Sequence, residues 1–195
     1  GHSCLTIEME NGQRVMIDPF ITGNPLTDLT AEEVKTDWLL ITHGHSDHIG
    51  DMIPIAKENQ ATIISIVEIA DYANSRGVDS FGMNIGGKHA FPFGVVKFVH
   101  AQHSSSYEVD GIVQYMGEPS GIIIQAEGKT IYHAGDTAYF SDLGLLAEEF
   151  DIDVAFLPIG DNYTMGPEDA AKAAQTIRAK KVVPIHYNTF PVIEQ

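Results

Sequence analysis

Thr42-His43-Gly44-His45-Ser46-Asp47-His48 is the stretch of this sequence that decides the fold, because it places four ligand-type side chains directly after an apolar segment. That segment, residues 37–42, reads Asp-Trp-Leu-Leu-Ile-Thr and predicts a buried strand. In an extended turn, residues two apart can point to the same side. The two histidines that flank the glycine can therefore hold one metal ion, while the aspartate and the last histidine face a second.

Three further apolar segments are followed by residues of the same kind. Residues 95–99 lead to His103, residues 130–133 lead to Asp136, and residues 181–185 lead to His186. Strand ends at one edge of a fold are where side chains from distant parts of a sequence can converge. Imidazole and carboxylate groups suit Zn, Fe, Mn or Co, so these segments predict a metal site.

The candidate ligands divide into two sets. We expect one ion to be held by His43, His45 and His103, and the other by Asp47, His48 and His186. Asp136 has two carboxylate oxygens and could bridge the two ions.

The rest of the chain alternates predicted strands and helices. Apolar–polar alternation around Asn11-Gly12 predicts a hairpin, and a second hairpin is expected around Glu127-Gly128. The expected strands are residues 5–10, 14–17, 37–42, 61–65, 95–99, 122–126, 130–133, 152–157 and 181–185, and the expected helices are residues 49–59, 67–76, 139–149 and 167–178. Two sheets packed face to face with helices outside accommodate this mixture.

Composition limits the classes of partner. The net charge is -16, from 27 acidic and 11 basic side chains, and such a surface repels phosphate backbones. No apolar run reaches the roughly 18 residues of a membrane span. We therefore expect a small-molecule substrate, with no nucleic acid and no membrane as partner. A homo-oligomer is left open.

The location is expected to be cytoplasmic. The N-terminal residues Gly1-His2-Ser3-Cys4 carry no signal-like apolar core, and Cys4 has no second cysteine with which to form an internal disulfide.

The ligand motifs resemble those of the metallo-β-lactamase superfamily, in the order Thr-His-Gly-His-Ser-Asp-His, Ala-Gln-His103, Ala-Gly-Asp136-Thr and Pro-Ile-His186. They are most similar to the small single-domain branch related to ascorbate-6-phosphate lactonase. The resemblance implies an α/β fold, a four-layer αβ/βα sandwich with two mixed sheets, forming one domain over residues 1–195. It also implies a few residues before Gly1 and one more strand and helix after Gln195.

Several residues are candidates for supporting roles. Asp18 follows a predicted strand, and we expect its carboxylate to hydrogen-bond a ligand histidine. The resemblance keeps His2 near the site, where it could support a ligand or contact substrate. The segment from Gly160 to Gly166 is a candidate substrate loop, with Asn162 and Tyr163 as polar contacts.

Other residues of reactive type are expected to be structural. His89 is interpreted as a surface residue, and His133 as a hydrogen-bonded structural one. His100 is expected to support the site or the fold without binding metal. Cys4 is interpreted as a small core residue, and residues 104–106, Ser-Ser-Ser, as a polar loop without a nucleophile elbow.

The resulting hypothesis is metal-assisted hydrolysis by two divalent ions, Zn first, with Mn, Fe or Ni as alternatives. Asp47 or Asp136 could accept or relay the proton. Lactones, phosphodiesters, thioesters and amides remain open as substrates, with sugar-phosphate lactones and small esters favoured by the resemblance. The alternatives are an iron-dependent oxidoreductase, against which His45 argues because di-iron relatives typically carry Glu there, and a non-catalytic metal-binding or interaction protein.

Overall fold

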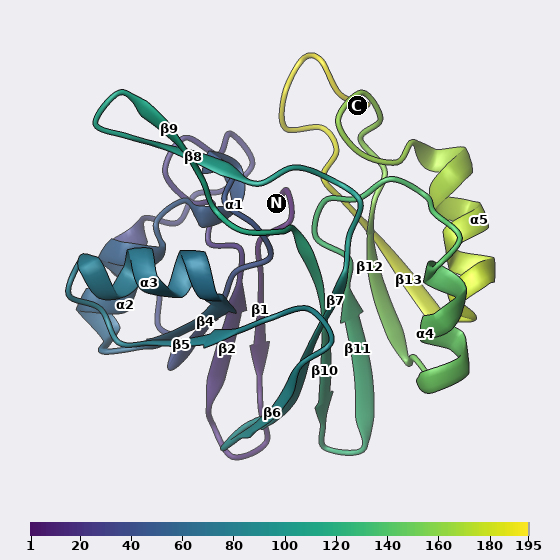
Figure 1. Cartoon of the computed structure of the whole chain (residues 1–195), viewed down its shortest axis with the longest axis horizontal. Helices are drawn as coiled ribbons and strands as arrows, with labels where there is room; N and C mark the ends of the chain where they lie inside the picture. Colours follow the sequence, from purple (N-terminus) through teal and green to yellow (C-terminus); the bar gives the residue numbers. More distant parts are fainter. Residues whose placement is uncertain (195) are drawn as a thin grey trace.

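The structure, a computed structural model, describes residues 1–194 as four layers (Figure 1). Two sheets face each other in the middle. Helices α2 (Met52–Asn59) and α3 (Val67–Ser75) cover the outer face of one sheet, and α4 (Leu143–Glu149) and α5 (Pro167–Ile177) cover the other. The predicted αβ/βα sandwich with two mixed sheets is confirmed.

The first sheet has the strand order β1-β2-β3-β4-β5. Its strands are β1 (Leu5–Glu8), β2 (Arg14–Ile17), β3 (Trp38–Leu40), β4 (Thr62–Ile66) and β5 (Ser80–Met83). The pair β1 and β2 is antiparallel, and the other neighbours are parallel. Parallel pairing sends the carboxyl ends of β2, β3 and β4 to one edge of the sheet.

The second sheet has the order β13-β12-β11-β10-β7-β6. Its strands are β13 (Lys181–Ile185), β12 (Val154–Pro158), β11 (Lys129–His133), β10 (Ser120–Ala126), β7 (Gly94–His100) and β6 (Lys88–Phe91). Strands β11, β12 and β13 are parallel, and the remaining pairs are antiparallel.

Side-chain alternation along the strands builds three cores. Leu39 packs toward α2 and α3, whereas its neighbour Leu40 packs between the two sheets with Phe98 and Ile122. The third core lies between the second sheet and the helices α4 and α5, where Ala173 is fully buried. A strand that is buried on both faces has a continuous run of apolar residues. This is why the apolar run within residues 37–42 predicted the strand β3.

The structure differs from the predicted elements in the first helical region. The expected helix over residues 49–59 is two helices, α1 (Ser46–Ile49) and α2. Gly50 breaks it at φ 36, where an added Cβ would lie 2.5 Å from the carbonyl oxygen of Pro19. The chain therefore turns against the loop after β2, and α1 carries two of the candidate ligands.

Two further differences lie in the second half. The helix expected from residue 139 begins at Leu143. Residues 139–140 are irregular, and residues 141–142 form a turn in which the amide of Gly144 donates to the carbonyl of Ser141. The hairpin of β8 (Ser106–Val109) and β9 (Ile112–Tyr115) was missed. Its turn, Asp110-Gly111 with φ of 53 and 78, is a strong hairpin signal.

One edge of the sandwich gathers the segments that follow β3, β7, β11 and β13. The N-terminus and the segment after β13 both lie in the upper half of Figure 1, at this edge, and the amide of His186 donates to the carbonyl of His2. Within residues 1–194, no helix combines the length and the apolar character needed to cross a bilayer.

Candidate metal centre

Three histidines form the first cluster at this edge. His43 Nε2 lies 3.0 Å from His45 Nδ1, which lies 3.2 Å from His103 Nε2. Zinc–nitrogen bonds of about 2.0–2.1 Å imply roughly 3.3 Å between donors in a tetrahedron. The observed separations match that spacing, so these three nitrogens could hold one ion.

A buried relay fixes the ring of His43. Thr42 Oγ1 donates to Asp18 Oδ2 at 2.7 Å, so its oxygen is left to accept from His43 Nδ1 at 3.0 Å. A neutral imidazole carries one proton. Nε2 of His43 therefore presents a lone pair to the cluster.

The second cluster comes from α1 and the end of β13. Asp47 Oδ2 lies 3.8 Å from His48 Nε2 and 3.7 Å from His186 Nε2. His48 Nδ1 donates to Asp18 Oδ2 at 2.8 Å, which leaves Nε2 as the inward-facing nitrogen. Asp18 lies where the sequence predicted it, beside a candidate ligand histidine.

Asp136 stands between the clusters. Its Oδ2 is 3.0 Å from His186 Nε2 and 3.6 Å from His103 Nε2, and its Oδ1 is 3.2 Å from His48 Nε2. One carboxylate thus reaches candidate ligands of both sets, which is the geometry expected of a bridging group.

Buried atoms without partners indicate that cations fit this site. Among residues 1–194, His48 Nε2 and Asp136 Oδ1 are buried and form no hydrogen bond, although they face each other. An unsatisfied buried polar atom is costly, and each one in a native structure needs an explanation. A divalent ion touching both atoms would satisfy them, so the residues present fit the metal that the fold implies.

The protonation of the two clusters differs. Burial lowers the pKa of His43, and it also lowers the pKa of His45 and His103. Burial also disfavours the charged form of His48 and His186, but neighbouring carboxylates outweigh it. Asp136 raises the pKa of His48 well above its usual value and, with Asp47, raises the pKa of His186 to about 9.

The carboxylates shift in the opposite direction. Burial alone would raise the pKa of Asp47, yet the nearby imidazole of His186 and the hydrogen bond with His2 hold it well below its usual range. The histidines around Asp136 likewise outweigh burial and lower its pKa.

Close backbone packing positions two of the histidines. A Cβ on Gly44 would lie 2.4 Å from Met116 Cβ, and the amide of Gly44 donates to Ser105 Oγ. A Cβ on Gly160 would lie 2.1 Å from the carbonyl oxygen of His186. Glycine is therefore needed at both positions.

Strained backbone conformations concentrate around the site. His2, Asp18, His186 and Asn188 all have positive φ, between 47 and 58. Non-glycine residues there cost of order 1–3 kcal/mol each and persist where their surroundings determine them. Their clustering supports a functional origin.

A cavity of about 250 Å³ opens beside the clusters. It is lined by His45, Asp47, His103, Ser104, Asp136, Tyr163 and His186. Asn162, the other residue expected to contact substrate, lines a neighbouring depression with Glu194.

The remaining histidines lie apart. His133 is buried and satisfied, because Nε2 donates to the Ser3 carbonyl and Nδ1 accepts from the Gly135 amide. His89 is exposed. His100 is also exposed and packs edge-on against Phe140.

Cys4 packs against the first core. Its burial raises the pKa of the thiol to about 12, in agreement with the structural role expected for it.

Sequence reasoning missed two supporting residues. Ser105 holds the turn at Gly44, and Thr189 holds His2 through a bond of 2.9 Å between Oγ1 and Nδ1. Both residues follow a candidate ligand by two or three positions, a spacing that could have suggested them.

A four-layer sandwich with histidines and aspartates at one edge defines the class of metallo-hydrolases with the metallo-β-lactamase fold. The chain belongs to the β-lactamase superfamily, because the model of the β-lactamase superfamily domain matches residues 13–187. It is 62% identical over 195 residues to a metal-dependent hydrolase of Enterococcus faecalis, covering all of this chain and 87% of that protein. A metal-dependent hydrolase of Anoxybacillus flavithermus is 60% identical over 196 residues, with coverage of 100% and 87%.

Solved structures agree with this assignment. Igni18, a metallo hydrolase from the archaeon Ignicoccus hospitalis, superposes with a TM-score of 0.89 at 41% identity, covering 100% of this chain and 83% of that one. A Parabacteroides distasonis protein, named as a candidate metal-dependent hydrolase, shares the fold with a TM-score of 0.74 at 24% identity, over 98% and 81% of the two chains. This chain is a metal-dependent hydrolase of the superfamily.

Proposed function

We propose that the protein hydrolyses a small ester, lactone or phosphoester with the aid of two divalent ions. The proposed ligands are His43, His45 and His103 for the first ion, Asp47, His48 and His186 for the second, and Asp136 for both. The observation that carries this proposal is the position of Asp136, whose two oxygens approach both clusters within 3.0–3.9 Å.

The chemistry that two divalent ions supply at such a site is Lewis acidity, which activates water and polarises the scissile bond. The protein's own contribution is to hold the donors rigidly. Asp18 is fully buried and binds Thr42 and His48 together. One carboxylate thus orients rings in both clusters, as supporting residues of metal sites usually do.

Asp47 is the better-placed proton acceptor of the two candidates. Its side chain is 23% exposed and lines the cavity, whereas that of Asp136 is 3% exposed. A general base must reach the proton that it takes, directly or through one water. Asp47 can meet that requirement from the cavity, and Asp136 is confined between the clusters.

The cavity limits the substrate to a small molecule. Its volume of about 250 Å³ is just below the usual range of roughly 300–1,000 Å³ for ligand pockets. Tyr163 is 57% exposed at this cavity, where its hydroxyl can meet a polar group of the substrate. Zinc is the metal that we favour, since nitrogen and carboxylate donors suit it.

A metal-by-substrate panel tests this function. The metal-free protein is reconstituted separately with Zn, Mn, Fe and Ni, and each form is assayed on generic esters, lactones, phosphoesters, thioesters and amides. We expect two metal equivalents per chain and turnover of at least one class, lost in Asp136→Asn. Two bound equivalents with no turnover in any form would contradict the proposed substrate classes, and fewer than two equivalents would contradict the dinuclear site.

A further inference from the structure

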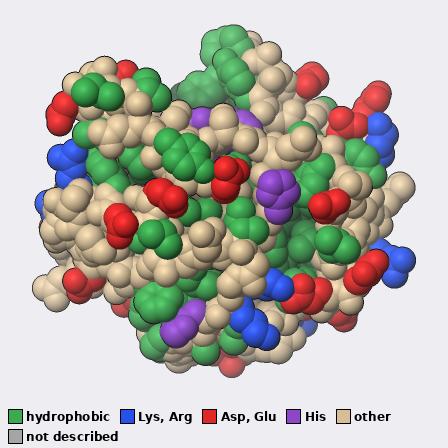
Figure 2. Space-filling view, viewed as in Figure 1, with side chains coloured by type: hydrophobic (Ala, Val, Ile, Leu, Met, Phe, Trp, Pro, Cys, Tyr) green, Lys and Arg blue, Asp and Glu red, His purple; other side chains and the backbone are tan. Residues whose placement is uncertain are grey.

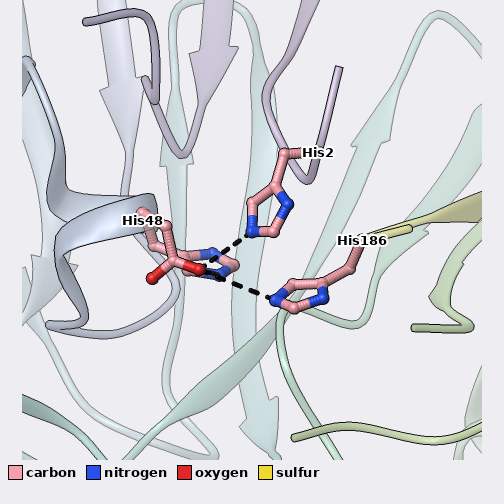
Figure 3. Close-up of side chains that lie close together, drawn as sticks. His2, His48 and His186 are labelled. Atoms are coloured by element: carbon pink, nitrogen blue, oxygen red, sulfur yellow. Dashed lines mark hydrogen bonds and ion pairs between the residues drawn. The ribbon is translucent and has the colours of Figure 1, made fainter. Parts of the chain in front are cut away.

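His2 presents a third imidazole to the second cluster. Its side chain is fully buried, and its Nε2 lies 2.9 Å from Asp47 Oδ2. Figure 3 shows the rings of His2, His48 and His186 directed toward one another from three different segments of the chain. The ligand atoms of these residues and of Asp47 all lie within 4.8 Å of one another.

The proton on His2 can be assigned from its other hydrogen bond. Thr189 Oγ1 donates its only proton to the carbonyl of Tyr187 at 3.0 Å. The same oxygen lies 2.9 Å from His2 Nδ1 and must accept there. Nδ1 of His2 therefore carries a proton.

This assignment leaves Nε2 of His2 with a lone pair whenever the ring is neutral. The lone pair then faces a carboxylate oxygen of Asp47 at 2.9 Å. Two acceptors cannot remain at that distance in a buried site unless a proton or a cation lies against both. A metal ion next to both atoms satisfies them without a second proton on the ring.

Two proposed ligands are held in the same way. His43 donates through Nδ1 to Thr42, and His48 donates through Nδ1 to Asp18, so both present Nε2 to the cluster. His2 repeats this arrangement with Thr189 as its acceptor. Its backbone also adopts a positive φ of 58, a conformation that is costly for histidine and aims the ring inward.

We propose that His2 is a direct ligand of the second ion, with Thr189 as the positioning residue that fixes its tautomer. The inference rests on the proposed two-metal function. It adds a donor to Asp47, His48, His186 and Asp136, so the second ion has a higher coordination number than the ion of the three-histidine cluster.

Cobalt(II) substitution tests this proposal in the chain of 195 residues. The intensity of the visible Co(II) bands rises when the coordination number falls. In His2→Ala we expect the affinity for the second ion to fall by more than about 100-fold. This exceeds the roughly 10–100-fold loss caused by removing a residue that only hydrogen-bonds a ligand. We also expect the visible bands of the second Co(II) ion to become more intense. In Thr189→Val we expect a loss of about 10–100-fold at the same ion, with Thr189→Ser close to wild type. His100→Ala, which removes an exposed histidine, serves as the control and should change neither affinity nor spectrum.

Several outcomes would overturn the proposal. A Co(II) spectrum that is unchanged in His2→Ala means that His2 acts only as a charged partner of Asp47. Unchanged affinity in Thr189→Val, a variant of nearly equal shape, overturns the tautomer assignment even if His2→Ala fails to fold. The two proposals fail separately. Wild-type protein that binds fewer than two ions contradicts the dinuclear function, whereas two ions with an unmoved His2→Ala spectrum contradict the role of His2 alone.

Discussion

At the scale of single residues, the site depends on which ring nitrogen carries the proton. Asp18 accepts a hydrogen bond from Nδ1 of His48, and Thr42 accepts one from Nδ1 of His43, so Nε2 of each ring is directed inward. The residue that accepts the Nδ1 hydrogen bond thereby determines that Nε2 is the nitrogen free to bind metal. Removing Asp18 or Thr42 should reduce metal affinity by roughly 10–100-fold, the usual effect of losing a residue that hydrogen-bonds a metal ligand.

The ligand assignment predicts that single substitutions separate the two ions. His43→Ala should weaken one ion, and His186→Ala should weaken the other, because each ring supplies a donor to a different cluster. Asp136→Ala should weaken both. Metal analysis after dialysis against graded chelator measures this, and equal small losses in all three variants would show that the assignment is wrong.

The pKa shifts predict that acid removes the second ion first. The raised pKa values of His48 and His186, the latter about 9, mean that both rings carry a second proton and are cationic at neutral pH in the metal-free protein. An ion must displace that proton, so its affinity falls as the pH drops below about 9. The lowered pKa of His43 keeps its cluster neutral to lower pH.

This order can be measured with each ion isolated. His186→Ala should keep the first ion, and His43→Ala the second, and equilibrium dialysis from pH 9 to pH 5 follows their release. The midpoint for the second ion should lie at the higher pH. Coincident or reversed midpoints would refute the explanation.

Cys4 and His89 provide negative controls at the same scale. The partly buried thiol of Cys4, with its pKa raised to about 12, should resist alkylation at pH 8 in the folded protein, because the thiolate is the reactive form. Cys4→Ser and His89→Ala should leave metal content and turnover nearly unchanged. Loss of metal in Cys4→Ser would mean that the site has been misidentified.

At the scale of elements, the ends of four strands and the close approach of loops bring the ligands together. His186 follows β13 directly, and the Gly160 loop follows β12, its parallel neighbour. The amide of Ile159 donates to the carbonyl of Ile185, so the two segments continue side by side beyond their strands. Any side chain added at Gly160 must displace His186.

Gly160→Ala is therefore expected to weaken the second ion. The added Cβ would meet the His186 carbonyl at 2.1 Å and Nδ1 at 3.1 Å, and overpacking of this kind costs typically 1–3 kcal/mol. Gly144→Ala in α4 is the matched control, since its Cβ meets only Thr176 Cγ2 at 3.8 Å. Chemical denaturation and metal analysis should find the control equal to wild type or up to about 1 kcal/mol more stable. Normal metal content in Gly160→Ala would contradict the packing argument.

At the scale of the whole molecule, charge and the metal cluster have opposite effects on anions. Acidic side chains are spread over the face seen in Figure 2, with fewer basic ones between them, and the net charge is -16. Two divalent ions would attract one nearby anionic group at short range, while salt screens the distant surface over about 10 Å. Small anionic substrates remain compatible with this surface.

Long polyanions should not bind. Affinity for nucleic acid comes mainly from lysine and arginine releasing counterions and weakens with salt, and this chain has only 11 such residues against 27 acidic ones. Fluorescence titration with single- and double-stranded oligonucleotides, in chelator and at two salt concentrations, measures this. Sub-micromolar, salt-sensitive binding would require a basic groove and would refute the prediction.

Local pattern was enough to predict most of the elements and the polar residues that the structure brings together at one edge. The apolar run before Thr42 marked β3, and the alternation around Asn11-Gly12 marked the first hairpin, because burial imposes a period on each element. The motif from His43 to His48 also indicated a metal site, because it gathers imidazole and carboxylate groups, which are metal ligands, within six residues. The turn Asp110-Gly111 between β8 and β9 is a local signal of the same kind.

Only the tertiary structure decided how those residues meet. Thr189 and His2 are 187 positions apart, and His2 and Asp47 are 45 positions apart, so no local period relates them. The break at Gly50 likewise depends on contact with Pro19, which lies on another segment. Propensity and periodicity act over a few residues, whereas the direction of a hydrogen bond and the position of a shared carboxylate depend on packing between segments that are distant in the chain.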